Sequence, residues 1–265
     1  MANINKEINW LLKEKYHNQP TKQFTKDIQR LKEGEPLAYV IGFVDFLGCK
    51  IDLSKKPLIP RTETEFWVQE ALKDIMTSKN FLLSHSLGQN FQILDIFSGS
   101  GCIGLAILKN VKNANVIFVD KEKYCLEQIK INCKLNTSLI RANKGCSKGK
   151  RFFVVKADVF SAIKGKYDFI FANPPYVPIK NKNKVQKSVL KYEPKKALFG
   201  GKDGLFYVKK FLKQAKNYLN SNGKIFMEFD PPQKKEIENL IKKYKYRTYK
   251  FNKDQYKKWR WVIID

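Results

Sequence analysis

From residue 90 onward, short apolar segments alternate with longer amphipathic ones, and this rhythm constrains the fold more than any other feature of the chain. Segments such as FQILDIF (91–97) and NVIFVD (115–120) are β-branched and aromatic, which favours buried strands. Apolar strands that alternate with helices are typical of a parallel sheet covered on both faces, so the sequence predicts an α/β fold. The expected strands cover 91–97, 115–120, 151–158, 167–173, 223–230, 247–254 and 259–265, and the expected helices cover 102–110, 121–135, 204–219 and 233–244.

The two ends of the chain depart from this rhythm. A short loop joins 247–254 to 259–265, which predicts an antiparallel pair at the end of the sheet. Apolar residues at helical spacing predict helices over 4–16 and 22–33. Residues 37–59 are aromatic, β-branched and interrupted by glycines, which indicates a hairpin rather than a helix.

Two further segments carry local signals. Thr62 and Glu65 match the capping box S/T-x-x-E before an apolar run, so we expect a helix from 62–63 to about 76. The polar and basic residues 137–150 are expected to form a surface loop.

The segment LDIFSGSGCIG (94–104) leads from a strand into a helix. Gly99 and Gly101 let the backbone turn sharply and approach a ligand closely, and ligands of open parallel sheets bind at the carboxyl ends of the strands. No Lys-Ser/Thr pair follows, so the loop is not a phosphate-gripping P-loop, and a plain strand-to-helix turn remains an alternative. Asp120 ends the next strand, 19 residues beyond Gly101. A carboxylate at this position can accept hydrogen bonds from both hydroxyl groups of a ribose. A dinucleotide and S-adenosylmethionine fit these features equally.

The residues NPPY (173–176) stop the next apolar strand at the same edge. Prolines lack a backbone N–H and cannot continue a central strand, and they leave carbonyl oxygens free. Asn173 adds a side-chain carbonyl and Tyr176 a flat face. Together these groups predict a rigid slot that accepts two N–H bonds from one planar NH₂ group, which suits methylation of an amide or an exocyclic amine. A simple proline turn is the alternative.

Composition excludes several other chemistries. The two histidines, His17 and His85, leave little for a His-based metal site or a Ser-His triad. Five scattered cysteines, never spaced C-x-x-C, fit reduced thiols in a cytoplasmic protein. No apolar run reaches the ~18 residues of a membrane span, and the first 20 residues lack the pattern of a secretory signal. We therefore expect a cytoplasmic protein with no metal and no membrane contact.

The net charge is +26, from 51 Lys and Arg against 25 Asp and Glu. Such a field attracts polyanions, which favours proximity to RNA or the ribosome. Biased base composition explains the same excess, because the lysines are spread along the whole chain. Charge alone does not identify the substrate.

These motifs together resemble a class I S-adenosylmethionine-dependent methyltransferase, and further segments resemble the peptide chain release factor glutamine N5-methyltransferases. The resemblance runs from about residue 35 to the C-terminus. It rests on LDIFSGSG, VD (119–120), AD (157–158), NPPYVP, EPLAYVIGF (35–43), LIPRTETE (58–65), YEPKKALFGGKDGL (192–205) and FMEFDPPQ (226–233).

The resemblance implies a Rossmann-like fold with a mostly parallel seven-stranded sheet and an antiparallel C-terminal pair. It implies a short N-terminal helical region (1–36), a β-hairpin linker (37–60) and a methyltransferase domain (61–265). The partner implied is a class 1 release factor, whose GGQ glutamine would be methylated by a monomeric enzyme.

The resemblance also assigns roles to individual residues. The cofactor S-adenosylmethionine, which becomes S-adenosylhomocysteine, is expected on Asp95, Phe97, Ser98, Gly99, Ser100, Gly101, Asp120, Asp158, Val159 and Asn173. The substrate glutamine and the catalytic function are expected on Asn173, Pro174, Pro175 and Tyr176.

Four features depart from the family pattern. Phe97 replaces the usual first glycine of the loop, which predicts a tighter or shifted loop. Thr62 replaces a proline after Arg61 but can still cap the helix. Only about 34 residues precede the matching region, which predicts reduced or altered contact with the release factor. Val159 stands where some members have an aromatic residue, which predicts weaker stacking on adenine.

Two other functions remain open at this point. A DNA or RNA methyltransferase acting on N6 of adenine or N2 of guanine would use the same slot on a flipped base, and the lysine-rich stretch 178–196 favours it. A non-catalytic RNA-binding protein on this scaffold would tolerate loss of the slot, and the intact residues 173–176 argue against it.

Overall fold

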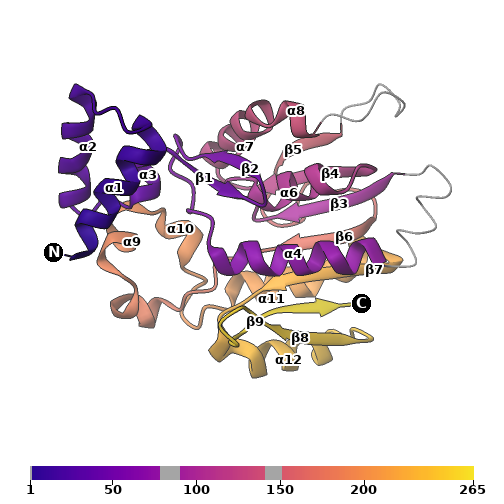
Figure 1. Ribbon diagram of the computed structural model, residues 1–265. Coiled ribbons are helices and arrows are strands. Elements are labelled where there is room, and N and C mark those ends of the chain that lie inside the picture. The colour runs from indigo at the N-terminus through magenta and orange to yellow at the C-terminus, as the bar shows by residue number, and fades with distance from the viewer. Residues whose placement is uncertain (1, 78–89, 141–150) are drawn as a thin grey trace.

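The structure is a computed structural model that describes residues 2–77, 90–140 and 151–265 (Figure 1). The expected loop at 137–150 is therefore only partly described, and His85 and Cys146 lie outside the described residues. No helix in these ranges is long and apolar enough to cross a membrane.

A seven-stranded sheet forms the centre of the molecule. Its order is β5-β4-β3-β6-β7-β9-β8, and the neighbours from β5 to β7 pair in parallel. β9 pairs antiparallel with both β7 and β8, which confirms the predicted closing pair. The strands are β3 (Phe91–Ile96), β4 (Ala114–Asp120), β5 (Phe152–Lys156), β6 (Tyr167–Ala172), β7 (Leu219–Glu228), β8 (Tyr249–Lys253) and β9 (Trp259–Ile264).

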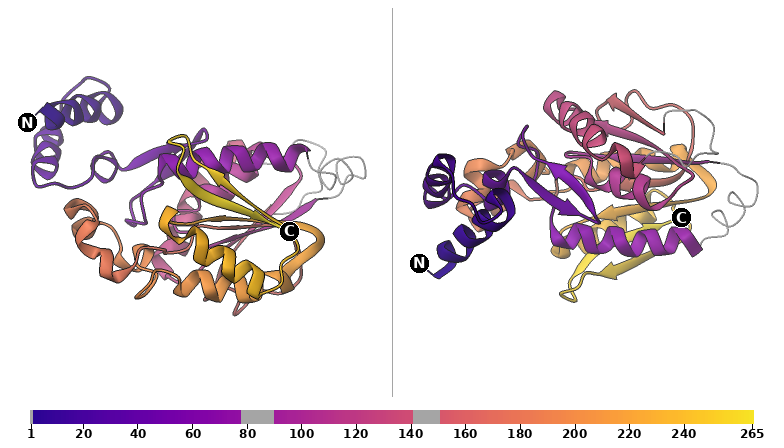
Figure 2. Two further views of the ribbon diagram at one scale, coloured as in Figure 1. Left: turned by 90° about the horizontal axis from the view of Figure 1, so that it is seen from below. Right: turned by 45° about the horizontal axis from the view of Figure 1, so that its top comes forward.

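Helices cover both faces of this sheet because alternate strand residues point to opposite sides. Phe91 and Ile93 belong to one buried cluster with residues of α4, α6 and α7, whereas Leu94 and Ile96 belong to another with residues of α11 and α12. Figure 2 shows α4 on one side of the sheet and α12 on the other. The predicted Rossmann-like fold is confirmed. These helices are α4 (Thr62–Thr77), α6 (Cys102–Asn110), α7 (Lys123–Leu135), α11 (Phe206–Ala215) and α12 (Lys234–Lys243).

The N-terminal region contains three helices and a hairpin. α1 (Ala2–Tyr16) and α2 (Lys22–Lys32) match the predicted helices, and the hairpin strands are β1 (Phe43–Phe46) and β2 (Cys49–Asp52). The prediction of a hairpin over all of 37–59 is wrong at its start, where α3 (Leu37–Ile41) forms a helix that ends at Gly42 with φ 99°. Leu37, Val40 and Ile41 pack with residues of α1 and α2 in a small cluster of their own, so tertiary packing overrides β propensity.

Two smaller predictions also need correction. Thr62 and Glu65 do not form the expected capping box in the part of the chain described, because the Glu65 carboxylate accepts the Leu47 N–H at 2.7 Å. The start of the expected 137–150 loop forms the short helix α8 (Thr137–Ile140), which follows directly on α7.

The basic stretch after NPPY wraps back toward the N-terminal helices (Figure 1). Lys191 Nζ and Tyr192 Oη both donate to the Glu33 carbonyl, at 3.4 and 3.0 Å. This stretch therefore joins the region before the hairpin to the carboxyl edge of the sheet. Its elements are η1 (Ile179–Lys184), α9 (Lys187–Tyr192) and α10 (Lys195–Leu198), and the other short 3₁₀ turns are η2 (Lys216–Tyr218) and η3 (Pro231–Gln233).

Candidate active site

The glycine loop between β3 and α6 is held by side chains at its own ends. Ser98 Oγ donates to the Asp95 carbonyl at 2.7 Å and accepts the Val119 N–H at 2.8 Å. The Asp95 carboxylate accepts the Gly104 N–H at 3.1 Å. Burial raises the pKa of Asp95 to about 8, and its Oδ1 has no hydrogen-bond partner among the residues described. Asp95 thus supports the loop from the protein interior.

Three residues of this loop adopt left-handed backbone conformations. Phe97, Gly99 and Gly101 have φ values of 61°, 54° and 81°. Phe97 therefore adopts a backbone conformation that favours glycine, the residue usual at this position in the family, and its side chain makes this conformation sterically unfavourable. Its ring lies 5.8 Å from the ring of Tyr207 and 6.4 Å from that of Phe211, and these contacts help to hold it.

Asp120 ends β4 directly opposite the loop. Its Oδ2 accepts the Gly99 N–H and its Oδ1 accepts the Glu122 N–H, each at 2.9 Å. Burial raises the pKa of the Asp120 carboxyl, although the backbone N–H groups of Glu122, Gly99 and Lys121 act in the opposite direction. A carboxylate offers about four acceptor positions, so Asp120 can also accept hydrogen bonds from a ligand.

Asp158 and Val159 follow β5 at the same edge of the sheet. The Asp158 carboxylate pairs with Lys210 of α11, and Val159 is buried with φ 61°. Val159 contributes an apolar surface without an aromatic plane. A β-branched residue is unfavourable in this backbone region, so the turn after β5 is held by its surroundings.

NPPY leaves β6 at Ala172, as predicted. Asn173 Nδ2 donates to Thr64 Oγ1 at 3.4 Å, and Tyr176 Oη donates to Glu228 Oε1 at 2.9 Å. The Tyr176 carbonyl accepts the Gln233 side chain at 2.9 Å. The Pro174 and Pro175 carbonyls accept no hydrogen bond from the part of the chain described, and the Pro175 carbonyl oxygen faces Gly200.

A carboxylate that was not among the predicted site residues lies behind this segment. Glu228 at the end of β7 is 1% exposed, and its Oε2 accepts Thr64 Oγ1 at 2.7 Å and Trp67 Nε1. Burial raises the pKa of Glu228, and its three donors oppose that effect. The available signal was an acidic residue at the end of an apolar strand, because a buried carboxylate requires partners.

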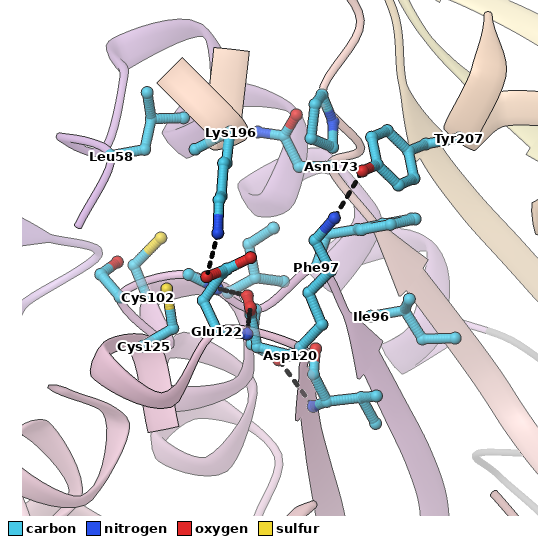
Figure 3. Close-up of a pocket in the computed structure, with 18 of the residues that line it drawn as sticks. Leu58, Ile96, Phe97, Cys102, Asp120, Glu122, Cys125, Asn173, Lys196 and Tyr207 are labelled. Carbon is cyan, nitrogen blue, oxygen red and sulfur yellow. Dashed lines mark hydrogen bonds and ion pairs between the residues drawn. The ribbon is translucent and has the colours of Figure 1, made fainter. Parts of the chain in front are cut away.

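A single pocket connects these parts and encloses about 890 Å³, some of it open to solvent (Figure 3). Within it Lys196 of α10 pairs with Glu122 at 3.1 Å. Four predicted site residues do not line it: Asp95, Gly101, Pro174 and Tyr176. The predicted residues that do line it are Phe97, Ser98, Gly99, Ser100, Asp120, Asp158, Val159, Asn173 and Pro175.

The segments that flank the pocket are tied to one another. The Glu193 carboxylate accepts the Ile59 N–H at 3.0 Å and the Arg61 guanidinium at 2.6 Å. Leu58 to Arg61 line the pocket, as do Lys196 and Ala197. The Glu193 contacts therefore hold two distant parts of the pocket wall together.

Comparison with known proteins agrees with this geometry. The methyltransferase small domain family matches residues 73–257. A release factor glutamine methyltransferase of Streptococcus pneumoniae is 33% identical over 96% of this chain and 84% of its own length. One from Thermodesulfovibrio yellowstonii is 35% identical over 80% and 70%.

A solved structure supports the fold. The catalytic domain of hMettl16 in complex with the MAT2A 3′UTR hairpin 6 superimposes with a TM-score of 0.59 over 82% of this chain and 75% of its own, at 15% identity. At that identity the match concerns architecture alone. The sequence matches are far stronger, and they show that the chain belongs to the release factor glutamine methyltransferase family.

Proposed function

We propose that this protein transfers a methyl group from S-adenosylmethionine to the side-chain nitrogen (N5) of the GGQ glutamine in a class 1 peptide chain release factor. The observation that carries the proposal is that Asn173 and Pro175 line the same pocket as Gly99 and Asp120. A slot for a planar NH₂ group and a site for a ribose are thus adjacent. The family membership supports the identity of the substrate.

The residues of the pocket fit S-adenosylmethionine. Asp120 can accept hydrogen bonds from ribose hydroxyls, and the left-handed Gly99 allows close approach of the backbone. Apolar side chains such as Val159 and Ile103 line the wall, as an adenine requires. When bound there, the cofactor supplies an electrophilic methyl group on a sulfonium.

The protein's part in the reaction is to orient the glutamine amide. An amide nitrogen is a poor nucleophile because its lone pair is delocalised. Asn173 Oδ1 and the Pro174 carbonyl can accept hydrogen bonds from its two N–H groups, which returns electron density to the nitrogen and aims it at the methyl group. One of these two protons is released when the nitrogen gains the methyl group. Such alignment is worth up to about 7–11 kcal/mol in well-oriented reactions.

The test is incubation with labelled S-adenosylmethionine and either the release factor or bulk DNA and RNA. We expect label in the release factor, and no label when its GGQ glutamine is changed. Label in nucleic acid alone would overturn the proposal in favour of a base amino-methyltransferase. Label in neither substrate, with S-adenosylmethionine still bound, would favour the RNA-binding alternative.

Asn173→Ala tests the slot itself. We expect this variant to lose methyl transfer while keeping nearly normal affinity for S-adenosylmethionine, measured by calorimetry. An equal loss of both would show that Asn173 is structural.

The surroundings of the pocket support further parts of the proposal. Lys180 and Lys182 are exposed beside NPPY, and such lysines favour contact with the release factor near ribosomal RNA. We propose a monomer that works in the cytoplasm, where the buried thiols of Cys49 and Cys102 stay reduced.

A further inference from the structure

In the buried hydrogen bonds behind NPPY, the chemistry of Trp67 determines which atoms donate and which accept, and this in turn determines how the Asn173 amide is oriented. Trp67 Nε1 can only donate a hydrogen bond, so Glu228 Oε2 must be an acceptor. The same oxygen is 2.7 Å from Thr64 Oγ1, which therefore uses its only proton in donating to Glu228. Hydrogen bonds from Thr64, Trp67 and Tyr176 favour the ionised form of Glu228, and in that form both of its oxygens are acceptors.

The hydrogen bond that Thr64 donates to Glu228 also determines how Thr64 interacts with Asn173. Thr64 Oγ1 has no proton left, so it can only accept from its neighbour Asn173 at 3.4 Å. The Asn173 amide must therefore turn its NH₂ group toward Thr64 and its carbonyl oxygen away. Among the described residues no donor meets Asn173 Oδ1, and Asn173 lies on the pocket (Figure 3).

We propose that Thr64 and Glu228 are positioning residues that fix the orientation of the Asn173 amide so that its oxygen, not its nitrogen, faces the substrate. This inference rests on the proposed function and extends it to two residues outside NPPY. With the opposite orientation, Asn173 would present a donor to a donor, and the substrate NH₂ group would be repelled. Thr64 and Glu228 are 2% and 1% exposed, so solvent does not compete for these bonds.

The rigidity of the network supports the same conclusion. Trp67 is fully buried, and its ring stacks on Phe171 and Trp261 at centroid distances of 6.1 and 6.0 Å. Its N–H is therefore fixed in space, and the Glu228 carboxylate is fixed with it. The orientation of Asn173 thus originates in packing within the core.

The test compares Thr64→Val, which keeps the shape and removes the hydroxyl, with Thr64→Ser, which keeps the hydroxyl. We expect Thr64→Val to lower kcat for release factor methylation about tenfold, with KM and the Kd for S-adenosylmethionine within twofold of wild type. Thr64→Ser should stay within twofold of wild type in all three quantities. Equal kcat values for Thr64→Val and wild type, or equal losses in both variants, would overturn the proposal.

Glu228→Gln tests the direction of the network. Because Trp67 can only donate, the glutamine should turn its oxygen toward Trp67 and Thr64 and its NH₂ group toward Tyr176, leaving Asn173 oriented. We expect kcat within about threefold of wild type, and a loss as large as that of Thr64→Val would contradict the assigned direction.

A measurement without substrate separates this proposal from the proposed function. In the free wild-type protein, the side-chain NH₂ resonance of Asn173 should show slowed exchange with water because it is bonded to Thr64. Thr64→Val should speed that exchange and Thr64→Ser should not. If wild type fails to methylate the release factor, the proposed function fails, while the exchange data still decide the orientation of Asn173.

Discussion

Gly200 lies against the back of NPPY, and the substitution Gly200→Ala offers a direct test of how tightly the slot must be held. A Cβ at this position would lie 2.3 Å from the Pro175 carbonyl oxygen and 2.4 Å from the Gly204 carbonyl oxygen. Real Cβ atoms essentially never come closer than 3.0 Å to such neighbours, so the backbone must move by roughly 0.7 Å. Neither oxygen belongs to a side chain that can rotate away.

The structure predicts where this displacement goes. The Gly200 N–H donates to the Val177 carbonyl at 3.0 Å, and the Val177 N–H donates to the Leu198 carbonyl at 2.9 Å. These bonds and the locked φ of Pro175 transmit the shift to NPPY as a whole. A misplacement of about 1 Å in an active site can reduce the rate about a hundredfold, so we expect kcat to fall about 10- to 100-fold.

The assay measures kcat and KM for release factor methylation beside the Kd for S-adenosylmethionine. Asp120 and Gly99 lie across the pocket from the strained contact, so the Kd should stay within about threefold of wild type. The matched control is Gly223→Ala in β7, whose Cβ would meet Leu219 at 2.8 Å and the Asp168 carbonyl at 2.9 Å, both away from the pocket. A Gly200→Ala enzyme with kcat within twofold of wild type would refute the view that NPPY must be held to sub-ångström accuracy.

Two buried carboxyl groups give the remaining predictions. Asp120→Ala should weaken S-adenosylmethionine binding by about 1.5–3 kcal/mol. In the wild-type protein, the Kd for S-adenosylmethionine should rise as the pH falls through the raised pKa of Asp120, because protonation removes acceptor capacity. Calorimetry over a pH series checks both, and a flat wild-type profile would contradict the assignment of Asp120 to the ribose. The pKa of Asp95 is raised to about 8 in the folded protein, so between about pH 4 and 8 the folded state holds a proton that the unfolded state has lost. The free energy of unfolding should therefore fall as the pH rises through this range, by up to about 1.4 kcal/mol per pH unit. Asp95→Asn should remove that dependence in urea unfolding and be most stabilising above pH 7, whereas a difference from wild type that does not change with pH would show that Asp95 does not titrate there.

Most of the fold could be predicted from local patterns of apolar residues in the sequence. Every predicted strand from 91–97 onward has its counterpart in β3 to β9, because apolar runs of this length between helical segments have few other solutions. The clear failure is α3, where Leu37 to Ile41 look β-branched and aromatic but pack as a helix on α1 and α2. That outcome depends on neighbours that a reading of local propensity does not supply.

The sequence predicted those pocket residues that lie at the carboxyl ends of neighbouring parallel strands. Gly99 and Asp120 were found because strand ends in a parallel sheet share one edge, and they meet at 2.9 Å. Thr64 and Glu228 are 164 residues apart in the chain, and nothing in their local sequences pairs them. Long-range hydrogen bonds between single residues leave no periodic signal, which is why the network behind Asn173 emerged only from the structure.

The same contacts give a structural role to three of the segments on which the resemblance to the release factor enzymes rests. One side of NPPY is supported by Thr64 and Glu228, and the other by Gly200 and by Gln233, whose side chain donates to the Tyr176 carbonyl. These four residues belong to the segments 58–65, 226–233 and 192–205, which are among those on which the resemblance rests. None of these residues donates to Asp120 at the proposed cofactor end of the pocket, where the donors are Gly99 and Glu122. We therefore expect substitutions in these segments to disturb the proposed acceptor slot, and with it methyl transfer, more than the binding of S-adenosylmethionine.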